Sequence, residues 1–379
     1  MTWFSPAVGA GRTIDVLILG AGPAGAALAL ALKRAGVASV LLVDRSARPS
    51  LRMGESAAPG LNSLLRRLGL DDRLEGRGHR PCYGNLSLWG GPTPIVEEFA
   101  TRADGPGWNL DREAFDAWLR AEAVARGATL ESQARLAAVV RDGDGWRADI
   151  RTGERNLEVR SRWIVDASGR PAAFARRSGA RLHRFDRLVA LAVRVESAES
   201  RGFDGFSMIE AVEIGWWYAA RLPGGKSAVA LMTDMDIARE TDLQSPDVFR
   251  QAWASTAEVR RFASLPDLAL RPVLFAAGTQ FIDRAIGPGW LALGDALVAL
   301  DPLSASGVTG ALEDAIAAAE AIIPLLGLES RGGEARNLRS AYCARANAML
   351  TRYLVERRSI YRREKRWGSG RFWQRRAVI

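Results

Sequence analysis

The chain has 379 residues and a mass of 41.1 kDa; 48% of the residues are hydrophobic and 25% are charged. These values exclude a fibrous or disordered protein, and the length predicts two closely joined lobes rather than one core. The two cysteines, Cys82 and Cys343, cannot build a disulfide framework, and only two histidines accompany them. We therefore expect no metal site and a reducing, cytoplasmic environment.

The formal net charge of +9 is concentrated at one end of the sequence. Residues 351–379 hold ten basic and two acidic residues, which leaves the rest almost neutral. No helix-turn-helix, zinc or RNA-binding signature accompanies them, so nucleic acid is not an expected partner. The residues leave two interpretations open, a solvated helix face and a surface for an acidic partner.

The first strong motif is a glycine cluster between a predicted strand, Ile14–Leu19, and a predicted helix, Ala26–Ala35. The surrounding residues 16–32 are uncharged, but their order of strand, turn and helix argues against a membrane span or an export signal. Gly20 suits a tight turn, Gly22 lets the backbone approach a pyrophosphate, and Gly25 allows the helix to pack closely on the strand.

A second predicted strand, Ser39–Val43, ends at Asp44, which follows Gly25 by nineteen residues. An acid at this place typically accepts hydrogen bonds from the adenosine ribose of a dinucleotide. The helix that follows the glycine cluster would turn its positive end toward the pyrophosphate. The sequence therefore predicts a dinucleotide-binding fold.

A later segment indicates which dinucleotide is bound. Gly294-Asp295 follows a short apolar strand, and Asp301-Pro302 and Gly307-Val308 precede a long alanine-rich helix. This arrangement resembles the second flavin-binding signature of the FAD-dependent aromatic monooxygenase superfamily. The resemblance implies that Asp295 binds the ribityl chain. It also implies that the helix N-terminus stabilises negative charge on the reduced flavin.

Three other segments follow the same family in order. Residues 52–56 resemble the Gly-Glu-Ser turn of the halogenase-like branch, Leu110-Asp111-Arg112 resembles the FAD-contacting arginine, and residues 163–169 resemble the strand that returns to the FAD-binding sheet. The resemblance implies this FAD-binding set: Gly20, Gly22, Pro23, Ala24, Gly25, Asp44, Arg45, Arg52, Ser56, Arg112, Gly169, Gly294, Asp295, Pro302, Gly307 and Val308.

The segment Gly215–Pro223 resembles the Trp-x-Trp-x-Ile-Pro motif of flavin halogenases, but it departs from that motif. When the two are aligned on Pro223, Tyr218 and Ala220 stand where the halogenases have tryptophans. Halogenases also use a lysine to carry the halogen, and residues 77–91, where we would expect it, contain none. Halogenation is therefore disfavoured.

The Gly-Trp-Trp-Tyr run, residues 301–304 and the basic C-terminal segment are most similar to flavoproteins that mature tryptophylquinone cofactors. Those relatives oxygenate a tryptophan within a partner protein. The resemblance implies a monooxygenase that hydroxylates an electron-rich aromatic substrate, a small molecule or a residue of a peptide or protein, through a flavin C4a-hydroperoxide. It would use FAD and dioxygen, with electrons from reduced nicotinamide or an external reductase.

Residue type alone suggests Glu55, His79 and Glu210 as candidate acids or bases, and Trp217 and Tyr218 as candidates for the substrate pocket. For His79 a hydrogen-bonded loop residue is the competing interpretation. A flavin-dependent halogenase, an isoprenoid-type flavin reductase and a non-catalytic FAD-binding partner protein remain open as alternative functions.

We predict an α/β fold in which a three-layer, Rossmann-like FAD-binding domain carries an inserted antiparallel-sheet substrate domain and a C-terminal helix. The FAD-binding domain would comprise residues 14–79, 101–180 and 273–330, and the substrate domain residues 80–100 and 181–272. Residues 331–379 would form the basic helical segment.

Overall fold

The computed structural model describes most of the chain. Arg52, one of the expected FAD-binding residues, lies outside the described residues. The described ranges are 13–46, 53–71, 74–99, 104–153, 155–197, 205–261, 270–328 and 332–378.

The first lobe is built on a mixed eight-stranded sheet with a parallel centre, as the sequence predicted. The strand order along its main path is β19-β20-β11-β1-β2-β8, and the hairpin β9-β10 extends it beside β11. β1 is almost entirely buried because every residue from Val16 to Leu19 is apolar. The strands are β1 (Thr13–Leu19), β2 (Val40–Asp44), β8 (Thr129–Ser132), β9 (Ala134–Asp142), β10 (Gly145–Thr152), β11 (Arg155–Asp166), β19 (Ile286–Gly287) and β20 (Trp290–Ala292).

Helix α1 (Pro23–Arg34) follows β1 directly and begins at Pro23, where the missing N–H of proline costs no helical hydrogen bond. It packs against α3 (Arg112–Ala125) and α7 (Gly307–Gly327), so the first glycine motif and the second flavin-binding segment lie in one core. Two shorter helices, α2 (Gly60–Arg67) and α4 (Ala173–Arg177), complete this lobe.

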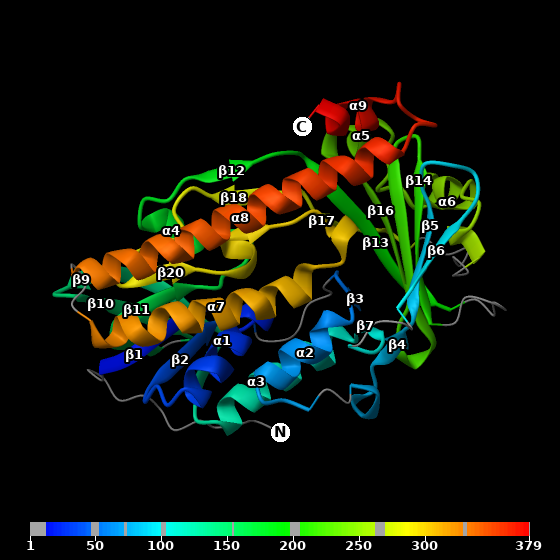
Figure 1. Ribbon diagram of the computed structural model, residues 1–379. Helices are drawn as coiled ribbons and strands as arrows, with labels where there is room; N and C mark the ends of the chain where they lie inside the picture. Colours follow the sequence, from blue (N-terminus) through cyan, green and yellow to red (C-terminus); the bar gives the residue numbers. More distant parts are fainter. Residues whose placement is uncertain are drawn as a thin grey trace.

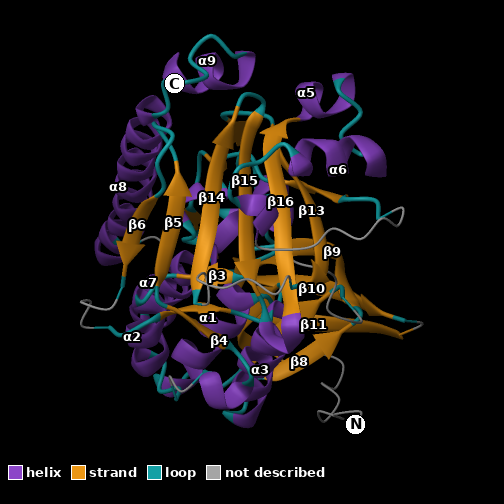
Figure 2. Cartoon of the chain, turned by 90° about the vertical axis from the view of Figure 1, so that its right-hand side faces the viewer, coloured by secondary structure: helices purple, strands orange, loops and turns teal. Residues whose placement is uncertain are grey.

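The second lobe is a seven-stranded sheet in the order β17-β13-β16-β15-β14-β5-β6, seen face-on in Figure 2. All its pairs are antiparallel except β14 with β5. One expected boundary was wrong, because β17 belongs to this sheet and not to the FAD-binding domain. The strands are β5 (Gly84–Leu88), β6 (Ile95–Glu98), β13 (Leu188–Glu196), β14 (Phe206–Val212), β15 (Gly215–Arg221), β16 (Lys226–Asp234) and β17 (Val273–Ala276).

The two faces of this sheet have different partners. Its outer face forms a core with α5 (Met235–Glu240) and α6 (Pro246–Ala254). Its inner face turns toward the FAD-binding lobe, and Met53 and Leu303 of that lobe pack against it (Figure 1). Because side chains alternate along a strand, neighbouring residues of β15 have opposite surroundings.

Two three-stranded sheets lie beside the main ones. The sheet β3-β7-β4 contains β3 (Ser56–Ala57), β7 (Gly107–Asn109) and β4 (Arg80–Cys82), and lies near the edge of the seven-stranded sheet in Figure 1. The sheet β12-β18-β21 contains β12 (Leu182–Arg184), β18 (Gln280–Ile282) and β21 (Val298–Ala299). β12 was expected in the substrate domain, but it pairs with β18 beside the second flavin-binding segment.

The C-terminal segment spans both lobes. Helix α8 (Gly333–Arg363) begins near the start of the expected helical segment at residue 331, runs past α7 and reaches the seven-stranded sheet, where α9 (Arg371–Val378) lies beside α5 (Figure 1). Phe372 and Trp373 are buried against the inner face of that sheet. Among the helices that the structure describes, none is long and apolar enough to cross a membrane.

Within the part of the chain that the structure describes, half of the ten basic residues of the C-terminal segment form ion pairs with acids. Arg376 is 1% exposed and lies 2.7 Å from Asp234, and Arg375 pairs with both Asp234 and Asp236. The buried guanidinium group of Arg376 holds α9 in place, since removing its partner would leave a buried charge unpaired. The others of this half are Arg357, Arg366 and Arg371, whereas Arg352, Arg358, Arg362, Arg363 and Lys365 are exposed.

Candidate functional site

The glycine turn after β1 is packed so closely that side chains could not replace Gly20 or Gly25. Gly20 has a φ of +111°, and a Cβ there would lie 2.2 Å from the carbonyl oxygen of Ala167. A Cβ on Gly25 would lie 1.9 Å from the carbonyl oxygen of Gly20. Gly22 is the N-cap residue of α1, so its backbone leads into the positive end of the helix. The turn thus has the form of a phosphate-binding loop.

Asp44, at the end of β2, is joined to this turn by a hydrogen bond. Its Oδ2 accepts from the backbone N–H of Ala21 at 2.8 Å, and its Oδ1 accepts from the N–H of Ser46 at 2.7 Å. Arg45 beside it is exposed, and Arg120 of α3 donates to the carbonyl oxygen of Ala21 at 3.4 Å. Binding of the ribose by Asp44 stays a prediction.

The second flavin-binding segment touches the first. Gly294 has a φ of +57°, and a Cβ there would lie 2.9 Å from the Cβ of Ala24. Its N–H donates to Asp314 of α7, which in turn pairs with Arg345 of α8 at 2.8 Å. The two motifs therefore form one cradle, although Ala24 and Gly294 are 270 residues apart in the sequence.

Asp295 follows Gly294 in the same turn of this cradle. Its side chain is 51% exposed, yet the surrounding protein raises the pKa of its carboxyl through desolvation, and Arg170 and Arg112 lower that pKa in part. Added Cβ atoms at Gly169 and Gly307 would meet nothing within 4 Å, so open space lies at both positions. These residues fit a bound FAD.

Helix α7 begins at Gly307, and Val308 is buried in its first turn. Before it, Pro302 begins a single turn of 3₁₀ helix that Asp301 caps by accepting a hydrogen bond from the N–H of Leu303 at 3.0 Å. The free N–H groups of the α7 N-terminus would attract negative charge on a group placed there.

Residues of α8 hold this turn from behind, and the sequence analysis missed them. Oδ2 of Asp301 accepts from the hydroxyl of Tyr361 at 2.6 Å and from Nε of Arg357 at 3.3 Å, and the N–H of Asp301 donates to Tyr353 at 2.8 Å. Their four-residue spacing places the three side chains on one face of the helix. The spacing is visible in the sequence and indicates a polar helix face, but it does not identify Asp301 as the partner.

The Gly-Glu-Ser turn lies between the two lobes. Nη1 of Arg112 donates to the carbonyl oxygens of Met53 and Gly54 at 2.9 and 3.1 Å. Glu55 is fully buried, and burial raises the pKa of its carboxyl, although Arg194 of β13, at 3.4 Å, lowers it in part. Arg194 was also missed, although it interrupts an otherwise apolar run, residues 188–195.

Ser56 joins the turn to the seven-stranded sheet. Its Oγ lies 2.6 Å from the hydroxyl of Tyr218 in β15 and donates to Oδ1 of Asn109 in β7 at 2.7 Å. Tyr218 is the one residue of β15 that is not fully buried. Its hydroxyl therefore lies where the two lobes meet.

Three expected site residues lie elsewhere. Trp217 is 1% exposed on the outer face of the sheet and packs against Phe249 of α6, so it cannot share a pocket with Tyr218. The carboxylate of Glu210 is also buried and accepts hydrogen bonds from the N–H groups of residues 257–259. His79 is 3% exposed and accepts from the N–H of Asp111 at 3.2 Å, and burial lowers its pKa. These placements contradict a role in the site for Trp217 and Glu210, and give His79 a structural one.

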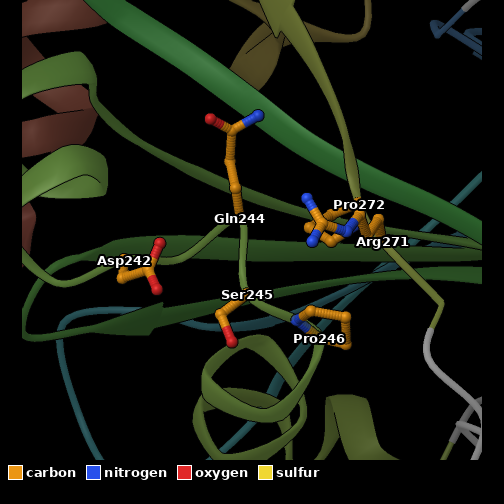
Figure 3. A pocket seen from close by; sticks show the side chains of 6 residues that line it. All are labelled: Asp242, Gln244, Ser245, Pro246, Arg271 and Pro272. Atoms are coloured by element: carbon orange, nitrogen blue, oxygen red, sulfur yellow. The ribbon is translucent and has the colours of Figure 1, made fainter.

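A separate hollow of about 360 Å³ lies beside the start of α6 (Figure 3). None of its lining residues belongs to the cradle described above, and we assign it no function. The lining residues are Asp242, Gln244, Ser245, Pro246, Arg271 and Pro272. Among the described residues, no group of three or more His, Cys, Asp or Glu side chains could hold a metal ion.

Comparisons with known proteins agree with this cradle. Residues 13–352 match the FAD binding domain family. The chain belongs to this family. It is 30% identical to LodB of Marinomonas mediterranea, whose name describes an FAD-dependent oxidoreductase, with 96% of this chain and 97% of LodB covered. The chain is thus an FAD-dependent oxidoreductase of the halogenase-like branch, as expected.

Halogenases are also among the relatives. The 1H-pyrrole-2-carbonyl-[peptidyl-carrier protein] brominase of Pseudoalteromonas luteoviolacea is 25% identical, with 82% of this chain and 77% of the brominase covered. The flavin-dependent halogenase CmlS has a TM-score of 0.85 and 26% identity over 97% of this chain and 68% of CmlS. QhpG, described as a peptidyl tryptophan dihydroxylase essential for tryptophylquinone cofactor biogenesis, has a TM-score of 0.77 and 25% identity over 97% of this chain and 79% of QhpG.

Proposed function

We propose that this protein is an FAD-dependent monooxygenase that hydroxylates an electron-rich aromatic ring, with a tryptophan of a peptide or protein as the preferred substrate class. The observation that carries the proposal is the position of Tyr218, whose hydroxyl meets the Gly-Glu-Ser turn on the inner face of the sheet. Tyr218 and Ala220 replace the tryptophans of the halogenase motif on that face. The similarity to QhpG supports the same substrate class.

FAD would be held by the cradle already described, with its pyrophosphate at the glycine turn and its ribityl chain near Asp295. When bound and reduced, FAD supplies the activation of dioxygen. The N-terminus of α7 would stabilise negative charge beside Gly307. The apolar inner face of the sheet would exclude water from the same space. Electrons would come from reduced nicotinamide or from a separate reductase.

The test is incorporation of labelled oxygen. The purified protein, loaded with FAD and reduced under anaerobic conditions, is mixed with ¹⁸O₂ and a tryptophan-containing peptide. We expect a mass increase of one ¹⁸O per hydroxylation, located on the indole ring by fragmentation. A peptide in which alanine replaces the tryptophan is the matched control and should gain no label. Rapid reoxidation without labelled product from any aromatic peptide or small molecule would contradict the proposal.

Halogenation is the second candidate, favoured by the similarity to the brominase and to CmlS. The same reaction is therefore run with chloride or bromide added. We expect no halogenated product, because residues 77–91 contain no lysine and Ala220 replaces a motif tryptophan. A product whose mass increases by one halogen would favour the halogenase and contradict our proposal.

A further inference from the structure

The hydrogen bonds around Ser56 have a definite direction. A serine hydroxyl carries one proton, and the proton of Ser56 is donated to Oδ1 of Asn109, which can only accept. The contact of 2.6 Å between Ser56 and Tyr218 then requires Tyr218 to be the donor. Both Ser56 and Asn109 belong to the β3-β7-β4 sheet, which keeps the acceptor in a fixed place.

This direction leaves Tyr218 with a single remaining capability. Its one proton points at Ser56, and the backbone N–H of Ser56 also lies close to its oxygen, so the lone pair that remains can only accept a hydrogen bond. Burial, and secondarily the nearby Glu55 carboxyl, raise the pKa of Tyr218 well above its ordinary value, so the hydroxyl keeps its proton at neutral pH. Tyr218 thus presents an acceptor and no donor to anything that binds beside it.

Tyr218 lies on the face of β15 that turns toward the FAD-binding lobe, and its side chain is partly exposed. Every other residue of β15 is buried, including Trp216 on the same face at 1% exposure. Ser56 belongs to the turn whose residue Gly54 is held by Arg112. Arg112 is also close enough to Asp295 to lower the pKa of that carboxyl. A short series of contacts therefore links Tyr218 to the place expected for the flavin.

We propose that Tyr218 determines specificity by accepting a hydrogen bond from an N–H or O–H group borne on the substrate ring, and that Ser56 and Asn109 are positioning residues for its hydroxyl. This inference rests on the proposed function, because it names the chemical group by which that site selects its aromatic substrate. An indole N–H is a donor without acceptor capability, so it matches the single capability that Tyr218 retains.

The experiment compares two peptides that differ in this donor. One contains tryptophan, and the other contains benzothienylalanine, in which a ring sulfur replaces the N–H with little change in shape. Binding to the oxidised FAD-loaded protein is measured by calorimetry, without turnover, and labelled-oxygen incorporation is measured in parallel. A third peptide, with tyrosine in place of the tryptophan, tests whether the donor is an indole N–H or a phenol O–H.

We expect the unmodified protein to bind the tryptophan peptide on the order of 10-fold more tightly than the benzothienylalanine peptide, because an unpaired hydrogen-bonding group at a binding site is costly. In Tyr218→Phe this ratio should fall to about 1, with FAD content unchanged. Tyr83→Phe removes a hydroxyl from a side chain that is 50% exposed, and should leave the ratio unchanged. Ser56→Ala releases the Tyr218 proton and should lower the ratio without removing the phenol ring.

The possible failures are distinguishable. If the unmodified protein labels the indole but binds both peptides equally, or if Tyr218→Phe keeps the full ratio, this inference is wrong and the proposed function stands. If no aromatic peptide or small molecule gains label or binds, the proposed function fails as well. If the tyrosine peptide binds more tightly than the tryptophan peptide, Tyr218 still selects a hydrogen-bond donor, but the preference for an indole is wrong.

Discussion

Replacing Tyr361 with phenylalanine tests how strongly α8 supports the turn before α7. The hydroxyl of Tyr361 donates to Asp301 at 2.6 Å and accepts from Nε1 of Trp216 at 3.0 Å. Losing the bond to a charged acceptor costs about 1.5–3 kcal/mol, and leaving the buried Trp216 N–H unpaired costs about 1–3 kcal/mol. Because the two losses share one atom and do not add in full, we expect a destabilisation of about 2–4 kcal/mol.

Thermal unfolding of the FAD-loaded and FAD-free forms measures this effect. With roughly 2 °C per kcal/mol for a large chain, the Tm of Tyr361→Phe should fall by about 4–8 °C. Weaker FAD binding should accompany the fall, since Asp301 and Pro302 belong to the flavin-binding segment. Tyr83→Phe is again the matched control and should change neither quantity. A fall below about 1 °C with unchanged FAD affinity would refute the view that this hydroxyl supports the turn.

Three further predictions concern the cradle, the buried acid and the basic segment. Gly22→Val should give a folded but colourless protein, because a side chain there would occupy the space of the pyrophosphate. Full FAD content in that variant would contradict the assignment of the glycine turn as the pyrophosphate-binding loop. The pKa of Glu55 is raised above 4.5, so the folded state holds its proton to higher pH than the unfolded state and stability falls as pH rises through the raised pKa. The stability of the unmodified protein relative to Glu55→Gln, from urea midpoints, should therefore decrease between pH 4.5 and 8, and a constant difference would contradict this. In the third variant, glutamine replaces the exposed basic residues Arg362, Arg363 and Lys365. It should associate more slowly with an acidic peptide, with the largest difference at low salt, and keep its FAD content. An association rate constant that does not depend on salt concentration would show that the basic segment has a structural role alone.

The cradle was predictable because its residues obey local rules. Only glycine tolerates the φ of +111° at Gly20 and the contact between Gly25 and the preceding turn. The strand, helix and acid that follow are fixed by short spacings, so their relation could be read directly from the sequence. The structure moved the ends of these elements by only a few residues.

The substrate side was less predictable because its relations are tertiary. Strand alternation already separates Trp217 from Tyr218, but nothing local tells which face of β15 turns toward the flavin. Glu210 was misjudged for the same reason, since its partners lie 47 to 49 residues away on the outer face. Tyr361 and Arg194 were missed because a helical spacing or a single charge does not reveal a partner that lies far away in the sequence.

The contacts of α8 also determine when, during synthesis, the turn before α7 becomes ordered. Asp301 and Tyr361 are 60 residues apart, and a ribosome adds about 5–20 residues per second. During synthesis, Tyr361 is therefore added about 3–12 s after Asp301, and until then its hydroxyl cannot stabilise the turn that contains Pro302. The FAD-binding lobe can build its sheet in that interval, but its last turn becomes ordered only after α8 has emerged. Ribosome-bound chains arrested before Tyr361 should thus bind FAD weakly, and the colour of the protein should appear late in its synthesis.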